Sequence, residues 1–335
     1  MSSTPSSSGI AVPKKHPETP DEGRAGRRRR QRLDRRGEGQ VGGRRRAANS
    51  LPARGEAVRE LGLALPPARM RLMRGGRTLK RWRYVGVYAP ELMLCAAEAR
   101  VGPLGQRFWA VVEPDGRLRR AAPASAPAGS MNGGRVRVRA MSGGGRVGRS
   151  VARGLVEIDL ALEEGDGSAA VETVSASGSR GYVWTRKLAG ARASGLIVID
   201  GRRRELDAEA VVDDTAGYHS RHTVWCWSAG VGRAVGAERV GWDQRDPENS
   251  ERTIWVDGRP SEVVPASFDE DLHRIRFAGG GELRFRPWAT LAHRTRLGLL
   301  RSDYRQPFGV FGGELPGGLV LAEGFGVTER HEAWW

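Results

Sequence analysis

Two adjacent carboxylates, two histidines and two tryptophans fall within the fifteen residues from Asp213 to Trp227. A carboxyl group surrounded by apolar side chains has a raised pKa, so it can protonate an alkene or a carbonyl group near neutral pH. Aromatic rings beside such an acid would stabilise a cation through their π faces. The segment therefore predicts acid chemistry on an apolar substrate, and its candidate catalytic residues are Asp213, Asp214, His219 and His222.

The orientation of these side chains follows from the alternation of a β-strand, in which every second residue shares a face. Trp225 and Trp227 then point the same way, whereas His222 lies on the opposite face with Val224 and Cys226. If the tryptophan face lines a barrel lumen, it suits an apolar or polyene ligand. The alternative is that both rings pack between the barrel wall and neighbouring strands.

The two aspartates project to opposite faces if the strand continues through them, so only one of them can enter the cavity of the tryptophans. The alternative is a pair at a turn or a domain junction, with one carboxylate bound to Arg221 or Arg186. His219 and His222 are three residues apart and also lie on opposite faces, which disfavours a shared metal ion. Either histidine could be the base partner of an aspartate or could fix a loop, and we expect neither a metal nor a cofactor.

Two further groups of residues are candidates for contact with a ligand. The pair Tyr182 and Trp184 shares a strand face and either lines a first barrel or seals its interface with a second. The segment 303–305 is a polar cluster close to a turn, which either contacts a ligand head group or braces a barrel rim through an arginine–aspartate pair. The predicted ligand-binding residues are Tyr182, Trp184, Trp225, Trp227, Asp303, Tyr304 and Arg305.

The elements that must position these residues are β-strands. Residues 135–139 and 155–163 alternate between apolar and polar or small residues, which is typical of strands with one buried face. Asn-Gly or Asp-Gly pairs lie between such runs and favour type I′ hairpin turns, because both central residues take positive φ. Helical patterns are few: residues 52–65 could form a helix, and residues 89–101 either a short helix or a buried strand. Many hairpin-joined strands with little helix indicate sandwiches or barrels.

Charge is concentrated at the start of the chain. The protein has 335 residues and a formal net charge of +16. Up to Arg54 there are fourteen lysines and arginines against five acidic residues, a net charge of about +9. This segment has almost no apolar side chains, so it should be disordered. It could be an arm that binds polyphosphate or nucleic acid, or an unselected extension from a start codon assigned too far upstream.

Several common functions are not supported by the motifs. No glycine-rich phosphate loop opens a helix, no nucleophile elbow occurs, and no His, Cys and carboxylate set has the usual zinc spacing. Cys95 and Cys226 lie far apart, which fits a reducing cytosol rather than a disulfide scaffold. Because there is no secretory signal and no apolar run of membrane length, we expect a cytoplasmic protein without a transmembrane segment.

Three long motifs resemble an uncharacterised bacterial family of unknown function. They are Gly102-Pro103-Leu104 with Gln106 and Trp109, the block GYHSRHTVWCWSAG at 217–230, and RSDYRQPFG at 301–309. The resemblance covers nearly everything from about residue 69 to residue 335 and leaves out the tail. Because the motifs are long, the resemblance is specific.

A second resemblance is to the group of carotenoid hydratase, tocopherol cyclase and AttH. The hallmark of that group is an Asp-His-Glu-Trp-Gly-like block followed by W-x-W-F. Here Asp213 and Gly217 match the block, Trp225 and Trp227 match the second motif, and residues 214–216 depart from it as Asp-Thr-Ala. The resemblance implies two lipocalin-like β-barrels in tandem, and it implies hydration or cyclisation of isoprenoids as an activity.

We therefore expect an all-β protein of two tandem lipocalin-like antiparallel β-barrels behind a disordered arginine-rich tail. The expected boundaries are 1–55 for the tail, 66–210 for the first β domain and 211–335 for the second. Barrels of this size hold one small ligand. The leading hypothesis is the binding of a hydrophobic, isoprenoid- or lipid-like molecule, with acid-catalysed hydratase or cyclase activity. The alternatives are a non-catalytic carrier with the same pocket and a nucleic-acid-associated protein that acts through its tail.

Overall fold

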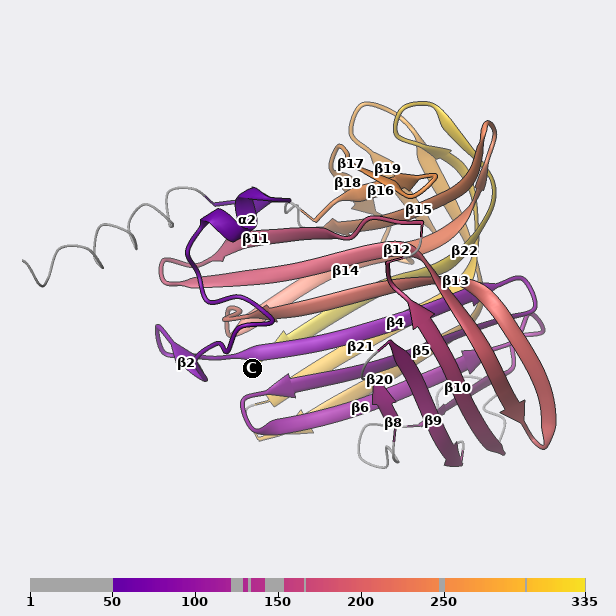
Figure 1. Cartoon of the computed structure of the whole chain (residues 1–335), viewed down its shortest axis with the longest axis horizontal. Coiled ribbons are helices and arrows are strands. Elements are labelled where there is room, and N and C mark those ends of the chain that lie inside the picture. Colours follow the sequence, from indigo (N-terminus) through magenta and orange to yellow (C-terminus); the bar gives the residue numbers. More distant parts are fainter. Residues whose placement is uncertain are drawn as a thin grey trace, which may run out of the picture. The chain divides into compact units, whose positions relative to one another are not determined.

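Alternating apolar and polar residues give almost nothing but strands in the computed structural model of this chain (Figure 1). The structure describes residues 51–121, 129–131, 134–141, 154–165, 167–246, 251–298 and 300–334. The predicted tail up to residue 50, and with it the predicted nucleic-acid contact, lies outside the described residues. All described residues fall within one unit, Gly42–Trp335.

The first antiparallel sheet contains eleven strands among the described residues. They are β1 (Ala53–Arg54), β4 (Lys80–Ala89), β5 (Leu92–Val101), β6 (Leu104–Val112), β7 (Leu118–Ala121), β8 (Gly129–Met131), β9 (Arg135–Met141), β10 (Leu155–Glu163), β11 (Val171–Ser177), β12 (Gly181–Ile199) and β13 (Arg202–Gly217). Their order is β7-β6-β5-β4-β13-β12-β10-β9-β8, and β11 pairs with β12 and β1. The long strands β12 and β13 therefore occupy the middle of the sheet, beside β4.

The second antiparallel sheet has nine strands in the part of the chain that the structure describes. They are β14 (His222–Ala234), β15 (Ala237–Asp246), β16 (Thr253–Val256), β17 (Arg259–Glu262), β18 (Ala266–Phe268), β19 (Arg274–Phe277), β20 (Glu282–Leu297), β21 (Leu300–Leu315) and β22 (Leu319–Trp334). Their order is β17-β16-β15-β14-β22-β21-β20-β19-β18. The strand β14, which comes first in the sequence of this sheet, thus pairs with β22, which comes last.

The segment before β4 covers part of the first sheet. It contains the helix α2 (Ala57–Glu60) and a small hairpin of β2 (Met73–Arg74) and β3 (Arg77–Thr78). Its buried apolar side chains pack against residues of β12 and β13. Residues 51–55, which the sequence assigned to the tail, belong to this folded segment, because β1 pairs with β11.

Two predicted hairpin turns are confirmed. Asp200–Gly201 joins β12 to β13 and Asp257–Gly258 joins β16 to β17, in each case as a two-residue loop. All four residues have positive φ, between 47° and 80°, as a type I′ turn requires. The sequence at 89–101, which allowed a helix or a strand, forms the strand β5, and the predicted helix near 52–65 is reduced to the four residues of α2.

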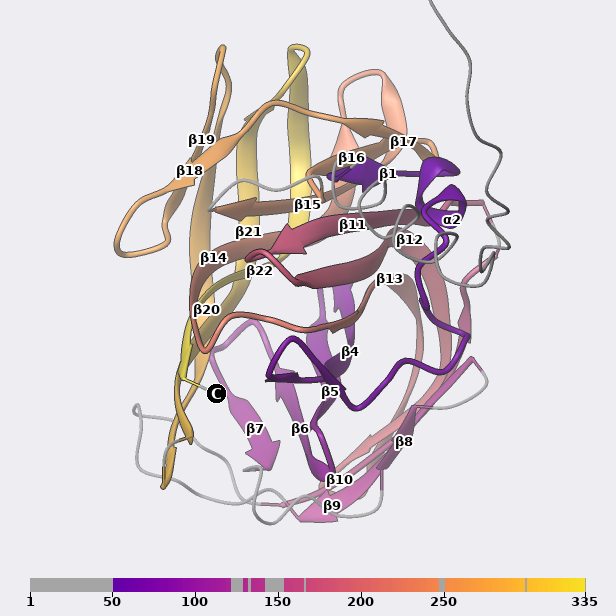
Figure 2. The same ribbon diagram turned by 90° about the vertical axis from the view of Figure 1, so that its left-hand side faces the viewer.

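Each sheet packs around its own hydrophobic core, and a third core lies where the two sheets meet. The core of the first sheet includes Val85, Ile158 and Val212, and that of the second includes Trp242 and Phe311. The third core joins side chains of β4–β6, β12 and β13 with others from β14 and β20–β22. Figure 2 shows β4, β5 and β6 beside β20 and β22. The cavity described below lies within this third core.

The predicted all-β fold is confirmed: the described residues form two large antiparallel sheets, and the strand order of each is open rather than closed into a ring. The chain passes from the first sheet to the second after Gly217 and before His222. The sequence placed this boundary before Val211, a position that falls inside β13, because β13 pairs with β4 and β12 along its whole second half. The described residues contain no helix with the length and apolar content that crossing a bilayer requires.

Candidate functional site

A cavity of about 90 Å³ lies between the two sheets and receives side chains from both. Its aromatic wall consists of Trp82, Tyr84, Phe108, Trp225, Trp227 and Tyr304. Its polar lining residues include Lys187, Asp213, Arg245, His293, Glu329 and His331. The cavity therefore combines the apolar surface that a hydrophobic ligand needs with several groups able to hold or move a proton.

Strand register explains how these residues meet. On the first sheet Asp213 of β13 lies between Tyr84 of β4 and Lys187 of β12. On the second sheet Trp227 of β14 is the register partner of Glu329 on β22. Because register partners on neighbouring strands point to the same side, each sheet presents one row of side chains to the other.

Glu329 is the buried acid of the cavity. Its carboxylate accepts hydrogen bonds from the indole Nε1 of Trp225 at 3.0 Å and from Nε2 of Gln306 at 3.1 Å. Burial raises the pKa of Glu329 to about 7, although the neighbouring Tyr304 hydroxyl and Trp225 indole oppose the rise and Asp213 adds to it. The carboxyl group therefore carries its proton for a substantial fraction of the time at neutral pH.

A second polar group forms around Lys187. Its ammonium Nζ lies 2.7 Å from Asp213, 3.3 Å from Glu251 and 3.7 Å from Asp243. Burial alone would lower the pKa of Lys187, but these three carboxylates together raise it well above its usual value. Burial raises the pKa of Asp243 to about 7, since one lysine cannot compensate three carboxylates. The hydroxyl of Thr215 donates to Asp213 at 3.1 Å.

Two histidines of the cavity are neutral. Burial lowers the pKa of His293 to about 4 and that of His331 to about 3. His331 shares a hydrogen bond of 2.8 Å with Ser302, and the rings of His293 and Tyr304 stack with centroids 4.9 Å apart. At neutral pH these imidazoles therefore contribute hydrogen-bonding groups and ring surface rather than positive charge.

Of the residues predicted from sequence, Asp213, Trp225, Trp227 and Tyr304 line the cavity together. The two tryptophans share a face, as the alternation predicted, and both are buried. Their rings do not face the interior of a barrel, because the core of the second sheet, which includes Trp242, lies on the other side of β14. The expectation of a cavity inside one barrel was therefore wrong, and the cavity lies between the sheets.

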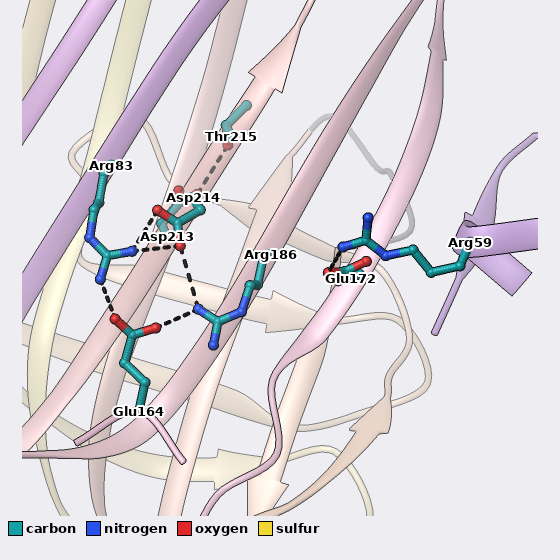
Figure 3. Close-up of polar contacts among 8 residues, drawn as sticks. All are labelled: Arg59, Arg83, Glu164, Glu172, Arg186, Asp213, Asp214 and Thr215. Carbon is teal, nitrogen blue, oxygen red and sulfur yellow. Dashed lines mark hydrogen bonds and ion pairs between the residues drawn. The ribbon is translucent and has the colours of Figure 1, made fainter. Parts of the chain in front are cut away.

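Asp214 faces away from the cavity, as its neighbour's orientation required. It forms a ring of ion pairs with Arg83, Arg186 and Glu164, which Figure 3 shows. The distances are 2.7 Å to Arg83 and 3.4 Å to Arg186. The sequence alternative of a pair with Arg186 is therefore confirmed for Asp214, whereas Asp213 binds Lys187 instead.

The two histidines of the central segment do not reach the cavity. The buried ring of His219 lies 4.9 Å from the ring of Trp82, behind the cavity wall. His222 is exposed, stacks on Trp334 and shares a hydrogen bond of 2.8 Å with Glu332. Neither histidine is therefore placed to act on a molecule in the cavity, because side chains or the sheet itself separate them from it.

The remaining predicted ligand-binding residues also lie elsewhere. Tyr182 and Trp184 pack under the N-terminal segment, where the Tyr182 hydroxyl donates to the carbonyl of Ala64 at 2.7 Å. Asp303 is exposed and pairs with Arg294 at 2.8 Å, and Arg305 is exposed on the same side of β21. Alternation separates these two residues from Tyr304, which points inward.

The sequence reading missed the residues that give the cavity its charge, above all Lys187 and Glu329. Glu329 did leave a signal: it is the one carboxylate on the alternating face Phe325, Val327, Glu329, His331. A single acid on a strand face that also carries Phe325 and Val327 indicates a buried carboxyl group. The sequence around Lys187 contains no comparable pattern, because apolar and polar residues flank it without regular alternation.

No group of three or more histidines, cysteines, aspartates and glutamates within the described ranges could hold a metal ion. In the cluster of Asp213, Asp243 and Glu251 the ammonium of Lys187 occupies the position of the cation. The arrangement is suited to proton transfer: a carboxyl group that holds a proton near neutral pH faces aromatic rings in a space largely shielded from water.

The chain belongs to the family described as "Domain of unknown function (DUF2804)", which matches residues 124–335. The family assignment made from the sequence motifs is thereby confirmed. No curated relative matches the chain in sequence.

Several solved structures are similar to the chain at low identity. One is a "putative AttH" from Nitrosomonas europaea, with 12% identity, a TM-score of 0.45, and coverage of 79% of this chain and 97% of that one. Another is kievitone hydratase from Nectria haematococca, with 11% identity, a TM-score of 0.43, and coverage of 75% and 88%. A third is CghA with Sch210972, with 11% identity, a TM-score of 0.39, and coverage of 82% and 95%.

Proposed function

We propose that this DUF2804 protein binds a hydrophobic, unsaturated small molecule between its two sheets and catalyses an acid-initiated reaction of it, a hydration or a cyclisation, with Glu329 as the proton donor. The observation that carries the proposal is the surroundings of Glu329. Its carboxyl group is buried against Trp225 and Gln306 and faces an aromatic cavity. A carboxyl group whose pKa lies close to the working pH is the most effective general acid.

The proposed chemistry begins with proton transfer from the Glu329 carboxyl group to a carbon–carbon double bond or a carbonyl group of the bound molecule. The cation that forms is stabilised by the Glu329 carboxylate left behind and by the neighbouring aromatic rings. In a hydration, water attacks the cation and the oxonium ion that forms loses a proton. In a cyclisation, a second double bond of the same molecule attacks the cation, and the new carbocation loses a proton from an adjacent carbon atom. In both cases the Glu329 carboxylate takes up this proton, so the acid is restored.

Asp213 and Lys187 have a supporting part in this proposal. Both carboxylate oxygens of Asp213 have partners, since one accepts from the Lys187 ammonium at 2.7 Å and the other from the Thr215 hydroxyl at 3.1 Å. Its negative charge instead raises the pKa of Glu329, after burial has done so. The proton donor is therefore assigned to Glu329 rather than to Asp213 or Asp214.

The first experiment identifies a ligand. Native mass spectrometry of the purified protein should detect a co-purifying apolar compound, and the Trp225→Ala variant should retain less of it because an aromatic wall is lost. The compound is then incubated with the protein in deuterium oxide. Protonation by Glu329 should place deuterium on a carbon atom of the product or of the recovered ligand, which mass spectrometry measures.

The variants decide between an enzyme and a carrier. Glu329→Gln should reduce deuterium incorporation about 100-fold or more, since it removes the general acid. Glu332→Gln is the control, because Glu332 is on the same strand but pairs with the exposed His222. Equal incorporation in wild type and Glu329→Gln would contradict the role of Glu329. A ligand that binds without any incorporation would indicate a carrier.

A further inference from the structure

A larger hollow adjoins the cavity on the side of the N-terminal segment. It has a volume of about 740 Å³, and its walls come from the end of β11, the residues around the start of β14, and Arg245 and Glu251. Arg245 lines both this outer hollow and the inner cavity. The side chain of Arg245 therefore lies at the boundary between the two spaces.

The inner cavity is too small for a typical ligand by itself. Its volume of about 90 Å³ is well below the roughly 300–1,000 Å³ of small-molecule pockets. Arg245 lies between the two spaces, next to the cavity wall formed by the indoles of Trp82 and Trp225, which are nearly parallel with centroids 6.2 Å apart. A molecule that places its apolar end beside Glu329 must therefore extend out of the cavity, and the outer hollow beyond Arg245 is large enough to receive the rest of it.

The guanidinium of Arg245 has more N–H donors than its ion pair with Glu251 can use. Its side chain is 16% exposed, and it lies 3.6 Å from Glu251 and 5.1 Å above the ring of Trp225. Among the described residues, its ion-pair partner is Glu251. A guanidinium has five N–H donors, and side chains this shielded from water normally use them. Because Arg245 lines both spaces, the donors that Glu251 does not take can reach a head group at this boundary.

The charges around this end of the hollow favour an anion. The pKa of the buried His219 is far below its usual value because of burial and because Lys80, Arg245 and Arg77 lie nearby. The carboxylates of the hollow already have cations: Glu251 lies 3.3 Å from Lys187, and Glu262 lies 3.2 Å from Arg252. The part of the hollow next to His219 is therefore electropositive.

We propose that the outer hollow binds the carboxylate head group of an amphiphilic ligand whose apolar, unsaturated body reaches into the inner cavity, and that Arg245 determines this specificity. The inference rests on the proposed function, because it assigns the second half of the same ligand site. A planar guanidinium matches a carboxylate through two parallel hydrogen bonds. Its stacking on Trp225 would place the head group next to the aromatic wall.

The test compares three compounds that share one hydrocarbon chain: dodecanoic acid, dodecanol and dodecylamine. Each displaces the uncharged fluorescent reporter N-phenyl-1-naphthylamine from the full-length protein. On wild type the acid should displace the reporter at about tenfold lower concentration than the alcohol, and the amine should be weakest. In Arg245→Met the acid and the alcohol should agree within about twofold, because the specific donors are gone.

Two further variants separate specificity from folding. Arg245→Lys keeps the charge without the forked donors, so it should show a reduced but measurable preference for the acid. Arg330→Met is the matched control and should keep the full preference, because Arg330 is exposed on the other face of β22 beside Glu329. Circular dichroism checks that each variant is folded.

The outcomes distinguish this inference from the proposed function. If all three compounds bind equally to wild type, or if Arg245→Met keeps the preference for the acid, the assignment of Arg245 is wrong while apolar binding stands. If none of the compounds displaces the reporter, the carboxylate assignment and the proposed apolar site are both overturned. A preference for the acid that disappears in Arg245→Met and persists in Arg330→Met supports the inference.

Discussion

Two neighbouring rows of charged residues on the first sheet come from the same strands but lie in contrasting surroundings. The buried row, Asp213 and Lys187, faces the second sheet, and these side chains are 11% and 2% exposed. The open row, Arg83, Asp214 and Arg186, faces away, and its side chains are 20–26% exposed. One step along each strand thus separates a charge cluster in a dry layer from one near water.

The two rows differ most in charge balance. The open row has two arginines against Asp214 and Glu164, which form a closed ring of ion pairs. Burial raises the pKa of Asp214 as well, but Arg83 and Arg186 oppose the rise. In the buried row, Lys187 faces Asp213 of its own sheet and also Asp243 and Glu251 from the second half of the chain, and Arg245 pairs only with Glu251 among these carboxylates. Burial raises the pKa of Asp243 in this cluster to about 7, so its carboxyl group can hold a proton near neutral pH, whereas in the open ring each carboxylate is paired with arginines.

The largest expected effect is that of Lys187→Met, which removes the one cation that all three carboxylates share. An uncompensated buried charge costs about 3–5 kcal/mol of the free energy of unfolding. Urea unfolding at neutral pH measures it. The loss should be smaller at pH 5 than at pH 8, because protonation of the carboxylates relieves their repulsion.

The matched variant Arg186→Met tests whether the contrast between the rows is real. It removes one of two arginines from the open row, so Arg83 still holds Asp214 and Glu164. The expected cost is about 1 kcal/mol. A loss as large as that of Lys187→Met would show that the open row matters as much to the fold as the buried one.

The next effect in size is the pH dependence due to Glu329. Because the folded-state pKa is about 7 and the ordinary value is 4.5, the folded protein holds this proton to higher pH than the unfolded chain. Its contribution to stability is present below about pH 4.5 and is lost as the pH rises towards 7. The total is on the order of 3 kcal/mol.

This effect is measured as a difference between two proteins. Buried His293 and His331 have lowered pKa values and contribute the opposite slope, with stability lost as the pH falls below about 6.5. Glu329→Gln keeps both histidines, so subtracting its stability curve from that of wild type isolates Glu329. The free energy of unfolding of Glu329→Gln, relative to that of wild type, should rise between pH 5 and pH 8. A difference that stays constant over this range would show that Glu329 has an ordinary pKa.

A smaller effect is expected for Asp214→Asn. The substitution removes a carboxylate from the open ring but leaves Glu164 between the two arginines. We expect a loss of about 1–2 kcal/mol in urea unfolding and no change in deuterium incorporation into the ligand. A loss of incorporation at unchanged stability would mean that the open row takes part in the chemistry.

Much of the fold could be predicted from the sequence because its information is local. Alternation in 155–163 and the Asp-Gly pairs at 200–201 and 257–258 fix strands and tight turns without reference to distant residues. The sheet to which β13 belongs is not local information. It depends on the pairing of β13 with β4, more than 100 residues earlier, so the predicted boundary at residue 211 missed it.

The candidate site shows the same division. Alternation placed Trp225 and Trp227 on one face and Asp213 opposite to Asp214, and the structure has both. Alternation could not show which part of the protein lies opposite those faces, because that depends on how the two sheets pack. Lys187 and Glu329 lie more than 100 residues apart and share the cavity only through that packing.

The smallest expected effect contrasts two adjacent residues of β21. Asp303 and Arg294 form a surface pair of 2.8 Å with side chains 52% and 76% exposed, so Asp303→Ala should cost less than about 0.5 kcal/mol. Tyr304 is buried, and its hydroxyl lowers the pKa of Glu329, so Tyr304→Phe should raise that pKa further. The pH at which stability falls should therefore shift upward in Tyr304→Phe and stay unchanged in Asp303→Ala. An equal shift in both variants would mean that the electrostatic influence on Glu329 is not confined to the inward face of the strand.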